Sequence, residues 1–355
     1  MLKTGENTYL YKNCVYIPPL AFVDDLFNIT ECGTKSVASN AYINTKVELK
    51  NLEFAIDEEK NEAKKCRHIH VGKENTFCPT LKAHNANIKK VNEEKYVGDI
   101  ISYDGKLTKT IQQRTSRAVG IISQITNILK SVSLGNHYFF IAILLRNAMF
   151  ISSVLINSEV WYPITKTDVE ELEKMDRQLL RNILEVPESC PKELIYLETG
   201  CIPLSIIIKC RRVNFLHYLL TRKEDELIFK FFKAQLRNPS KGDWTEIIQK
   251  DLIDLEISDS FEEIAKLSKN VFKKKVASAC KRYAFDKLIS DRNNKDGSKG
   301  KDLTYTKLKT ENYLINEKFS PQESKLLFKL RSRMLNVKGI FKSKYLNNDT
   351  FLQCA

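Results

Sequence analysis

The segment AFVDDLFNI, residues 21–29, places two adjacent aspartates at the centre of an apolar run. Apolar runs are buried in folded proteins, and a buried carboxylate is costly unless it is paired, hydrogen-bonded or bound to a metal ion. Two apolar runs that flank a short polar centre are typical of a tight hairpin, and aspartate tolerates turn geometry. We therefore predict a hairpin with Asp24 and Asp25 at or beside its turn.

This aspartate pair has two interpretations. Two carboxylates at a strand turn supply the hard oxygen ligands that Mg²⁺ binds in proteins, together with substrate phosphates. Two such ions about 3.5–4 Å apart can stabilise an in-line phosphoryl transfer. The other interpretation is a solvated hairpin tip, because a Phe-x-Asp-Asp motif is short enough to arise by chance. The pair alone leaves both open.

A second strand pair is predicted from EKYVGDIISYDGK, residues 94–106, where Asp104 and Gly105 form a strong turn signal. Between the two predicted pairs, residues 32–56 have the apolar spacing of a helix and residues 66–72 alternate like a strand. The first hundred residues therefore predict a small sheet accompanied by a helix.

After residue 105 the apolar residues follow the spacing of long amphipathic helices. Helices are predicted over residues 107–132, 137–161, 165–184 and 204–222. In the third, Thr167 is a suitable N-cap because Glu170 follows at the spacing of a capping box.

The fold class predicted from these patterns is α+β, with a small partial antiparallel sheet followed by a mainly α-helical region. Composition divides the chain into residues 1–104, 105–220 and 221–355. The segment SDRNNKDGSKGKD, residues 290–302, has few apolar residues and is predicted to be a linker.

The most apolar stretch, YFFIAILLRNAMFISSVLI, covers residues 138–156 and is long enough to span a membrane. Arg146 and Asn147 lie at its middle, where an arginine costs several kcal/mol in a bilayer. We therefore predict a buried core helix and no membrane partner.

The charge and the cysteines restrict the setting of the protein. The formal net charge is +13, which favours a polyanionic partner such as nucleic acid, although a soluble basic protein is the plainer interpretation. Nine cysteines at irregular spacings, without a CxxC motif or an apolar leader, predict reduced thiols in an intracellular protein. Nucleus and cytoplasm are not distinguished.

Several further motifs occur in a recognisable order. They are NAYINTKVELKNLEF (residues 40–54), KKCRHIHVGK (64–73), KYVGDIIS (95–102), INSEVWY (156–162), LEKMDRQLLRNIL (172–184) and YLETGCIPL (196–204). Together with FVDD (22–25), this series resembles the reverse transcriptases of non-LTR (LINE-like) retrotransposons. The resemblance implies a partial palm in residues 1–104, a thumb and post-thumb in 105–220, and a basic helical C-terminal region in 221–355.

The resemblance also implies roles for the aspartate hairpin. Asp24 would ligate two catalytic Mg²⁺ (or Mn²⁺) ions, and Asp25 would ligate or position one of them. Phe22 and Val23 would pack beneath the hairpin, near the nucleotide and the primer terminus. Lys65 would lie near the phosphates of the incoming nucleotide, although it reads equally well as a solvated lysine.

Other residues would contact the nucleic acid. The primer grip would be formed by Tyr96, Val97 and Gly98, although Gly98 also fits an ordinary strand end. Candidate phosphate contacts are Arg114, Arg117, Lys130, Arg211 and Arg212. Arginine and lysine neutralise backbone phosphates without reading sequence. Any single one of them equally fits a solvated helix face.

The implied activity is RNA-directed DNA polymerisation, a nucleotidyl transfer with an RNA template, a DNA primer and deoxynucleotides as partners and no other small-molecule cofactor. Such enzymes use a further aspartate from an earlier strand, whereas only 23 residues precede Asp24 and their one acid is Glu6. We therefore expect a C-terminal fragment that is inactive alone. At the other end, relatives often continue beyond FLQCA into a Cys/His knuckle that would begin at Cys354.

Two alternatives stay open. The chain could be a non-catalytic, basic, helical nucleic-acid-binding protein in which the aspartate hairpin is vestigial. It could also be an unstable remnant of a reading frame, with an exposed sheet edge.

Overall fold

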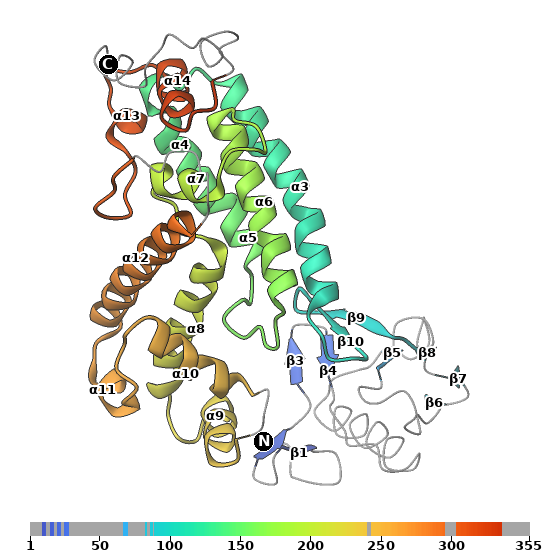
Figure 1. The fold of residues 1–355 in the computed structure, drawn as a ribbon. Coiled ribbons are helices and arrows are strands. Elements are labelled where there is room, and N and C mark those ends of the chain that lie inside the picture. The colour runs from blue at the N-terminus through green and yellow to red at the C-terminus, as the bar shows by residue number, and fades with distance from the viewer. Residues whose placement is uncertain are drawn as a thin grey trace. The chain divides into compact units, whose positions relative to one another are not determined.

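The computed structural model describes residues 9–11, 15–17, 20–22, 25–27, 67–69, 82–83, 86–87, 89–239, 243–294 and 303–335. Within these ranges the chain is mainly helical, with short strands paired in twos, as Figure 1 shows. The predicted α+β class is confirmed at this coarse level. The helix predicted over residues 32–56 lies outside the described residues.

The strands before Glu93 are short. Three pairs are antiparallel: β1 (Tyr9–Tyr11) with β2 (Val15–Ile17), β3 (Leu20–Phe22) with β4 (Asp25–Phe27), and β6 (Lys82–Ala83) with β7 (Ala86–Asn87). The fourth pair, β5 (Arg67–His68) with β8 (Lys89–Lys90), is parallel. In the β3–β4 pair, Phe22 is the register partner of Asp25. The hairpin predicted around the aspartate pair is therefore confirmed in its backbone.

The second predicted strand pair is also present, as β9 (Glu93–Tyr96) and β10 (Asp99–Ser102) in antiparallel register. The chain turns again after β10, where the amide of Gly105 donates to the Ser102 carbonyl at 3.0 Å. Asp104 stabilises this turn because its carboxylate accepts from the Ser102 hydroxyl at 2.6 Å and from the Lys106 amide at 3.1 Å. These hydrogen bonds hold the pKa of Asp104 below its ordinary value.

The helices that the structure describes after residue 107 are labelled α3 to α14. They are α3 (Thr108–Ser131), α4 (Tyr138–Leu145), α5 (Ser152–Val154), α6 (Lys166–Leu184), α7 (Lys192–Thr199), α8 (Leu204–Leu220), α9 (Leu227–Arg237), α10 (Trp244–Asp254), α11 (Phe261–Lys266), α12 (Lys269–Asn293), α13 (Asn312–Ile315) and α14 (Pro321–Arg331). A 3₁₀ turn, η1 (Gly135–His137), precedes α4, and a π-helical segment, η2 (Arg146–Ile151), joins α4 to α5.

The beginning of α6 corrects one prediction. The helix begins at Lys166, and its first turn is closed by Thr165 rather than by Thr167. The Thr165 hydroxyl accepts from the amide of Asp168 at 3.0 Å, and the Asp168 carboxylate accepts from the Thr165 amide at 3.2 Å. The prediction was wrong because Thr165 and Asp168 offer the same reciprocal capping chemistry one half-turn earlier.

The chain forms two compact units, each assembled from three separate segments. The first unit contains residues 1–117, 153–172 and 204–280, and the second contains 118–152, 173–203 and 281–355. The division into residues 1–104, 105–220 and 221–355 predicted from composition stays a prediction, because compact packing units and functional domains need not coincide.

In the first unit, α8 packs against α9, α10 and α11 around a buried apolar core. Asp251 of α10 is fully buried there, and its carboxylate accepts from the Arg212 guanidinium at 2.6 Å and from Lys209 Nζ at 2.7 Å. Burial opposes the charge on Lys209, but Asp251 attracts the proton, so the pKa of Lys209 is raised. The carboxylate is therefore shared by two cations of α8.

The apolar segment Gly135–Val154, nearly all of it in the second unit, is long and apolar enough to cross a membrane, as core helices also can be. Of an 18-residue apolar stretch in this segment, 33% is buried. The Arg146 guanidinium, 2% exposed, donates to both oxygens of the Asp176 carboxylate at 2.6 Å. Burial opposes its charge, but Asp176 raises the pKa of Arg146. The Tyr196 hydroxyl donates to the same carboxylate at 3.1 Å, which closes a buried polar cluster.

The end of α7 binds the described segment 303–335, also in the second unit. Glu198 is 1% exposed and accepts from Arg331 Nη2 at 3.0 Å, from the Tyr313 hydroxyl at 2.7 Å and from the Tyr305 hydroxyl. Burial and the charge of Glu198 raise the pKa of both tyrosines, so they remain hydrogen-bond donors. We call this group the Glu198 anchor.

Candidate functional site

The aspartate hairpin can be followed only in part. Phe22 ends β3 and Asp25 begins β4, and the backbone pairing between them is the described feature. Asp24, Val23 and Lys65 lie outside the described residues. The metal-ligating and nucleotide-binding roles that the resemblance implies for these five residues therefore stay predictions.

The tip of the β9–β10 hairpin can be followed in full, and it contains the predicted primer-grip residues. Tyr96 and Asp99 are register partners, so Val97 and Gly98 form a two-residue turn. Both have positive φ, +45° at Val97 and +90° at Gly98, as in a type I′ turn. This turn type matches the twist of paired strands, and Gly98 adopts it without steric cost.

Val97 adopts its positive φ only with backbone strain. A β-branched residue with positive φ is an outlier, since its side chain crowds the backbone in the left-handed region. The side chain of Val97 is nevertheless 44% exposed, so burial does not compensate for the strain. Backbone strain of this kind persists where the surroundings fix the conformation, and it concentrates at functional sites.

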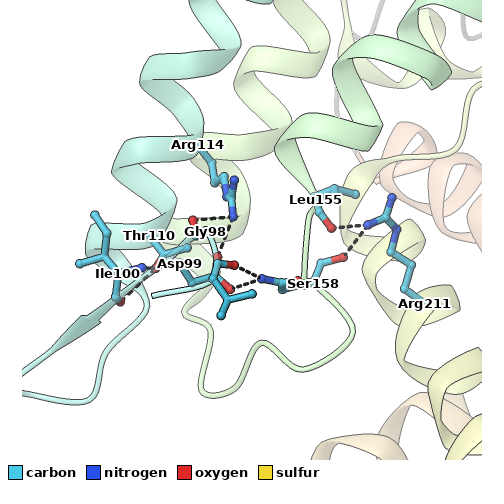
Figure 2. Close-up of polar contacts among 10 residues, drawn as sticks. Gly98, Asp99, Ile100, Thr110, Arg114, Leu155, Ser158 and Arg211 are labelled. Carbon is cyan, nitrogen blue, oxygen red and sulfur yellow. Dashed lines mark hydrogen bonds and ion pairs between the residues drawn. The ribbon is translucent and has the colours of Figure 1, made fainter. Parts of the chain in front are cut away.

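Two side chains from outside the hairpin hold its tip. Nη2 of Arg114, on α3, donates to the Gly98 carbonyl at 2.9 Å and to Oδ1 of Asp99 at 2.7 Å, as Figure 2 shows. Nδ2 of Asn157 donates to the Val97 carbonyl at 3.1 Å and to Oδ2 of Asp99 at 2.9 Å. Each carbonyl of the turn is therefore fixed by one side chain, and Asp99 joins the two.

Thr110 ties the next residue of the hairpin to α3. Its hydroxyl accepts from the Ile100 amide at 2.8 Å and donates to the Ile100 carbonyl at 3.1 Å (Figure 2). Thr110 is fully buried, so this reciprocal pair is shielded from water. The base of α3 therefore positions β10 through two successive turns, with Thr110 and Arg114 four residues apart on one face.

Arg211 supports the loop that carries Asn157. Its guanidinium donates to the Leu155 carbonyl and, at 3.3 Å, to the Ser158 hydroxyl, on either side of Asn157 (Figure 2). Burial lowers the pKa of Arg211, although the Glu159 carboxylate opposes the shift. Asn157 itself has a φ of +61°, a conformation that asparagine tolerates.

The five predicted phosphate contacts differ in how far they are exposed to solvent. Arg114 is 3% exposed and Arg212 is 4% exposed, and both are engaged by internal carboxylates. Arg211 is partly buried, whereas Arg117 and Lys130 are exposed on α3. The phosphate contacts remain predictions, and only Arg117 and Lys130 present their charges freely to solvent.

Lys130 borders a hollow of about 710 Å³ in the second unit. Arg181, Lys325 and Glu185 also line it. Lys325 donates to Glu185 at 2.8 Å, and this hydrogen bond lowers the pKa of Glu185. The lining therefore carries an excess of positive charge.

Sequence reasoning missed the residues that organise the hairpin tip. Asp99, Thr110 and Asn157 are ordinary polar residues in their local sequence, and their partners lie 10 to 60 positions away. The one available signal was the positive charge of Arg114 off the apolar stripe of α3, which was interpreted as a surface feature.

Of the aspartate pair predicted to bind a metal ion, Asp24 and the side chain of Asp25 lie outside the described residues. Among the side chains that the structure describes, no group of three or more His, Cys, Asp and Glu residues could hold a metal ion. The chemistry of the predicted donors, two carboxylates, suits a hard cation such as Mg²⁺.

The positive φ angles of Val97 and Gly98 predict that substitutions at these two adjacent residues change the stability of the hairpin in opposite directions. Replacing Val97 by asparagine is expected to stabilise the hairpin by about 1 kcal/mol, because asparagine accepts positive φ and Asn-Gly favours the type I′ turn. Replacing Gly98 by alanine is expected to destabilise it by about 1–2 kcal/mol, since φ is +90° there. Amide hydrogen exchange of β9 and β10 measures both changes, and equal effects would contradict the assigned strain.

The comparisons with known proteins do not identify a family. No protein-family model, no curated protein and no solved structure matches this chain.

Proposed function

We propose that the chain is part of an RNA-directed DNA polymerase of the non-LTR retrotransposon type, with a palm-type hairpin at residues 20–27. The observation that carries the proposal is the order of motifs from FVDD to YLETGCIPL, joined to the hairpin register that pairs Phe22 with Asp25. The net charge of +13 supports a polyanionic partner.

In this proposal the aspartate hairpin supplies oxygen ligands for Mg²⁺. The bound ions would offset charge on the phosphates when the primer 3′-hydroxyl attacks the deoxynucleotide. Asp24 and Asp25 would hold the ions, and Lys65 would lie near the nucleotide phosphates. Phe22 and Val23 would support the hairpin from below.

The β9–β10 hairpin supports the proposal because a primer grip needs a rigid tip. Hydrogen bonds from Arg114 and Asn157 fix both turn carbonyls, so the exposed side chain of Val97 has a defined direction. A positioning element gains from such preorganisation, since little entropy is then lost when the substrate binds.

The test measures binding of a DNA primer annealed to an RNA template, with the primer 3′-end recessed and blocked by a dideoxynucleotide. We expect affinity to fall as salt rises, because phosphate contacts release counterions. At constant ionic strength, Mg²⁺ is expected to strengthen binding several-fold in the wild type. Asp25→Asn is expected to remove this increment, and Asp104→Asn, which changes an acid of the turn after β10, is expected to retain it.

Other outcomes separate the alternatives. Salt-dependent binding without any effect of Mg²⁺ or of Asp25→Asn would support the non-catalytic nucleic-acid-binding protein. Absence of binding at low salt would contradict both functions. With an unblocked primer, the 355-residue chain is expected not to incorporate nucleotides; incorporation that Asp24→Ala abolishes would support the polymerase and overturn that expectation of inactivity.

A further inference from the structure

Two cysteines of the first unit lie along the seam where α8 faces α12. The His217 ring of α8 stacks on the Phe272 ring of α12, with ring centres 4.8 Å apart, and His217 Nε2 lies 2.8 Å from the Leu267 carbonyl oxygen. From this contact the buried residues run in opposite directions, through Val213 to Cys210 on α8 and through Val276 to Cys280 on α12. Helical spacings of three and four residues keep each series on one face.

The two thiols meet at the end of this seam. The Cys280 and Cys210 thiols lie within reach of a mutual hydrogen bond, and Nδ2 of Asn214 donates to the sulfur of Cys210 at 3.5 Å. Both cysteines are free thiols. Cys280 is 1% exposed, whereas Cys210 is only partly buried, so reagents in solution reach Cys210 first.

The environments of Cys210 and Cys280 suit different roles in thiol–disulfide exchange. The hydrogen bond from Cys280 and the nearby charge of Arg211 lower the pKa of Cys210, which favours its thiolate. The same hydrogen bond and burial raise the pKa of Cys280. The thiolate is the nucleophile in thiol–disulfide exchange. Because Cys210 is partly exposed and Cys280 is buried, Cys210 is placed to attack a disulfide in solution and Cys280 to resolve the product.

We propose that Cys210 and Cys280 form a redox-sensitive modification site that exchanges with low-molecular-weight disulfides such as oxidised glutathione. The Cys210 thiolate attacks one sulfur of the disulfide, which breaks its S–S bond and releases one glutathione thiolate. The Cys280 thiol, after losing its proton to that thiolate or to water, attacks the Cys210 sulfur and releases the second glutathione. The protein loses two electrons, and the glutathione disulfide is reduced to two thiols.

The product joins α8 to α12 covalently. Its bond would close a loop of about 70 residues that contains α9, α10 and α11, which restricts the unfolded chain and stabilises the first unit. Redox state would thus change the stability of the unit that contains the hairpin tip, without altering any residue of that tip.

The experiment equilibrates the folded, full-length chain with mixtures of reduced and oxidised glutathione, alkylates free thiols and maps the products by peptide mass spectrometry. In the wild type we expect a cross-linked peptide containing Cys210 and Cys280, two hydrogens lighter than the reduced pair. The first unit should then melt at a higher temperature, reported by fluorescence of Trp161 and Trp244.

Two variants distinguish the first step, in which Cys210 attacks the glutathione disulfide, from the second, in which Cys280 attacks the mixed disulfide. In Cys280→Ser, Cys210 is expected to accumulate a mixed disulfide with glutathione, because no resolving thiol remains. In Cys210→Ser, Cys280 is expected to stay reduced, because it is buried. The control Cys201→Ser changes a buried thiol of the second unit, 4% exposed, and is expected to leave the cross-link intact.

Some results would overturn the proposal. They are the absence of the cross-link in oxidised wild type, an unmodified Cys210 in folded Cys280→Ser, or a glutathione adduct on Cys280 in folded Cys210→Ser. Far-ultraviolet circular dichroism establishes that each variant is folded, and serine closely matches cysteine in size.

Discussion

Replacing Asp176 by alanine is expected to lower the free energy of unfolding of the second unit by about 3–5 kcal/mol, the range measured when one partner of a buried ion pair is removed. Asp176 is fully buried and Arg146 is 2% exposed. The variant leaves the guanidinium charge without its carboxylate, in a site that water does not reach. The Tyr196 hydroxyl loses its acceptor at the same time.

The loss of unfolding free energy in Asp176→Ala can be assigned to the second unit by measuring the two units separately. Both tryptophans, Trp161 and Trp244, belong to the first unit, so their fluorescence does not report the second. Amide exchange of residues 173–184 of α6 and of α7 under mild denaturant, compared with tryptophan fluorescence, therefore distinguishes local from global destabilisation.

A matched control and a rescue sharpen the prediction. Glu246→Ala removes an exposed partner of Lys250 and is expected to cost less than about 1 kcal/mol. Replacing Arg146 by methionine together with Asp176 by leucine is expected to recover much of the stability, because apolar side chains of similar volume often substitute for a buried pair. A loss below about 1 kcal/mol in Asp176→Ala would contradict the assigned role.

Replacing Gly200 by alanine is expected to destabilise the second unit by at least about 3 kcal/mol, from a left-handed backbone and a steric clash together. Gly200 follows α7 with a φ of +68°. A Cβ atom there would lie 3.0 Å from Lys309 Cα and closer still to the Lys309 carbonyl carbon and the Thr310 amide nitrogen. Backbone atoms cannot rotate aside, so the segment that they belong to must move.

Exchange or proteolysis of residues 303–335 measures this displacement, and both should increase in the variant. Gly120→Ala provides the control, because a Cβ at Gly120 in the middle of α3 would meet nothing within 4 Å. That substitution is expected to stabilise the chain by about 0.5–1 kcal/mol, as alanine favours helix more than glycine. Equal effects of the two substitutions would contradict the role of Gly200.

Much of the secondary structure could be predicted from local patterns. The strand pair predicted from residues 94–106 is present as β9 and β10, and the turn signal of Asp104 and Gly105 lies just after them. The tip itself was unremarkable in sequence, since Val97 is a poor residue for a type I′ turn. Its conformation depends on Arg114 and Asn157, which arrive from other elements.

The buried charges could not be predicted from local sequence. Arg114 and Arg212 each fit a solvated helix face by sequence until the carboxylate that each one contacts is known. Arg146 was recognised as unusual inside an apolar helix, but its partner Asp176 lies 30 positions away on the buried face of another helix. Sequence periodicity identifies the faces of helices, not which faces meet.

The Glu198 anchor has a consequence for chain continuity. The segment 303–335 is bound to α7 by an ion pair, by two tyrosine hydroxyls and by the bridge between Thr199 and Thr310. None of these contacts requires a peptide connection between Asn294 and Leu303. We expect a chain cleaved between those two residues to keep its pieces together as a noncovalent complex, whose dissociation constant would report the anchor together with the Lys325–Glu185 ion pair.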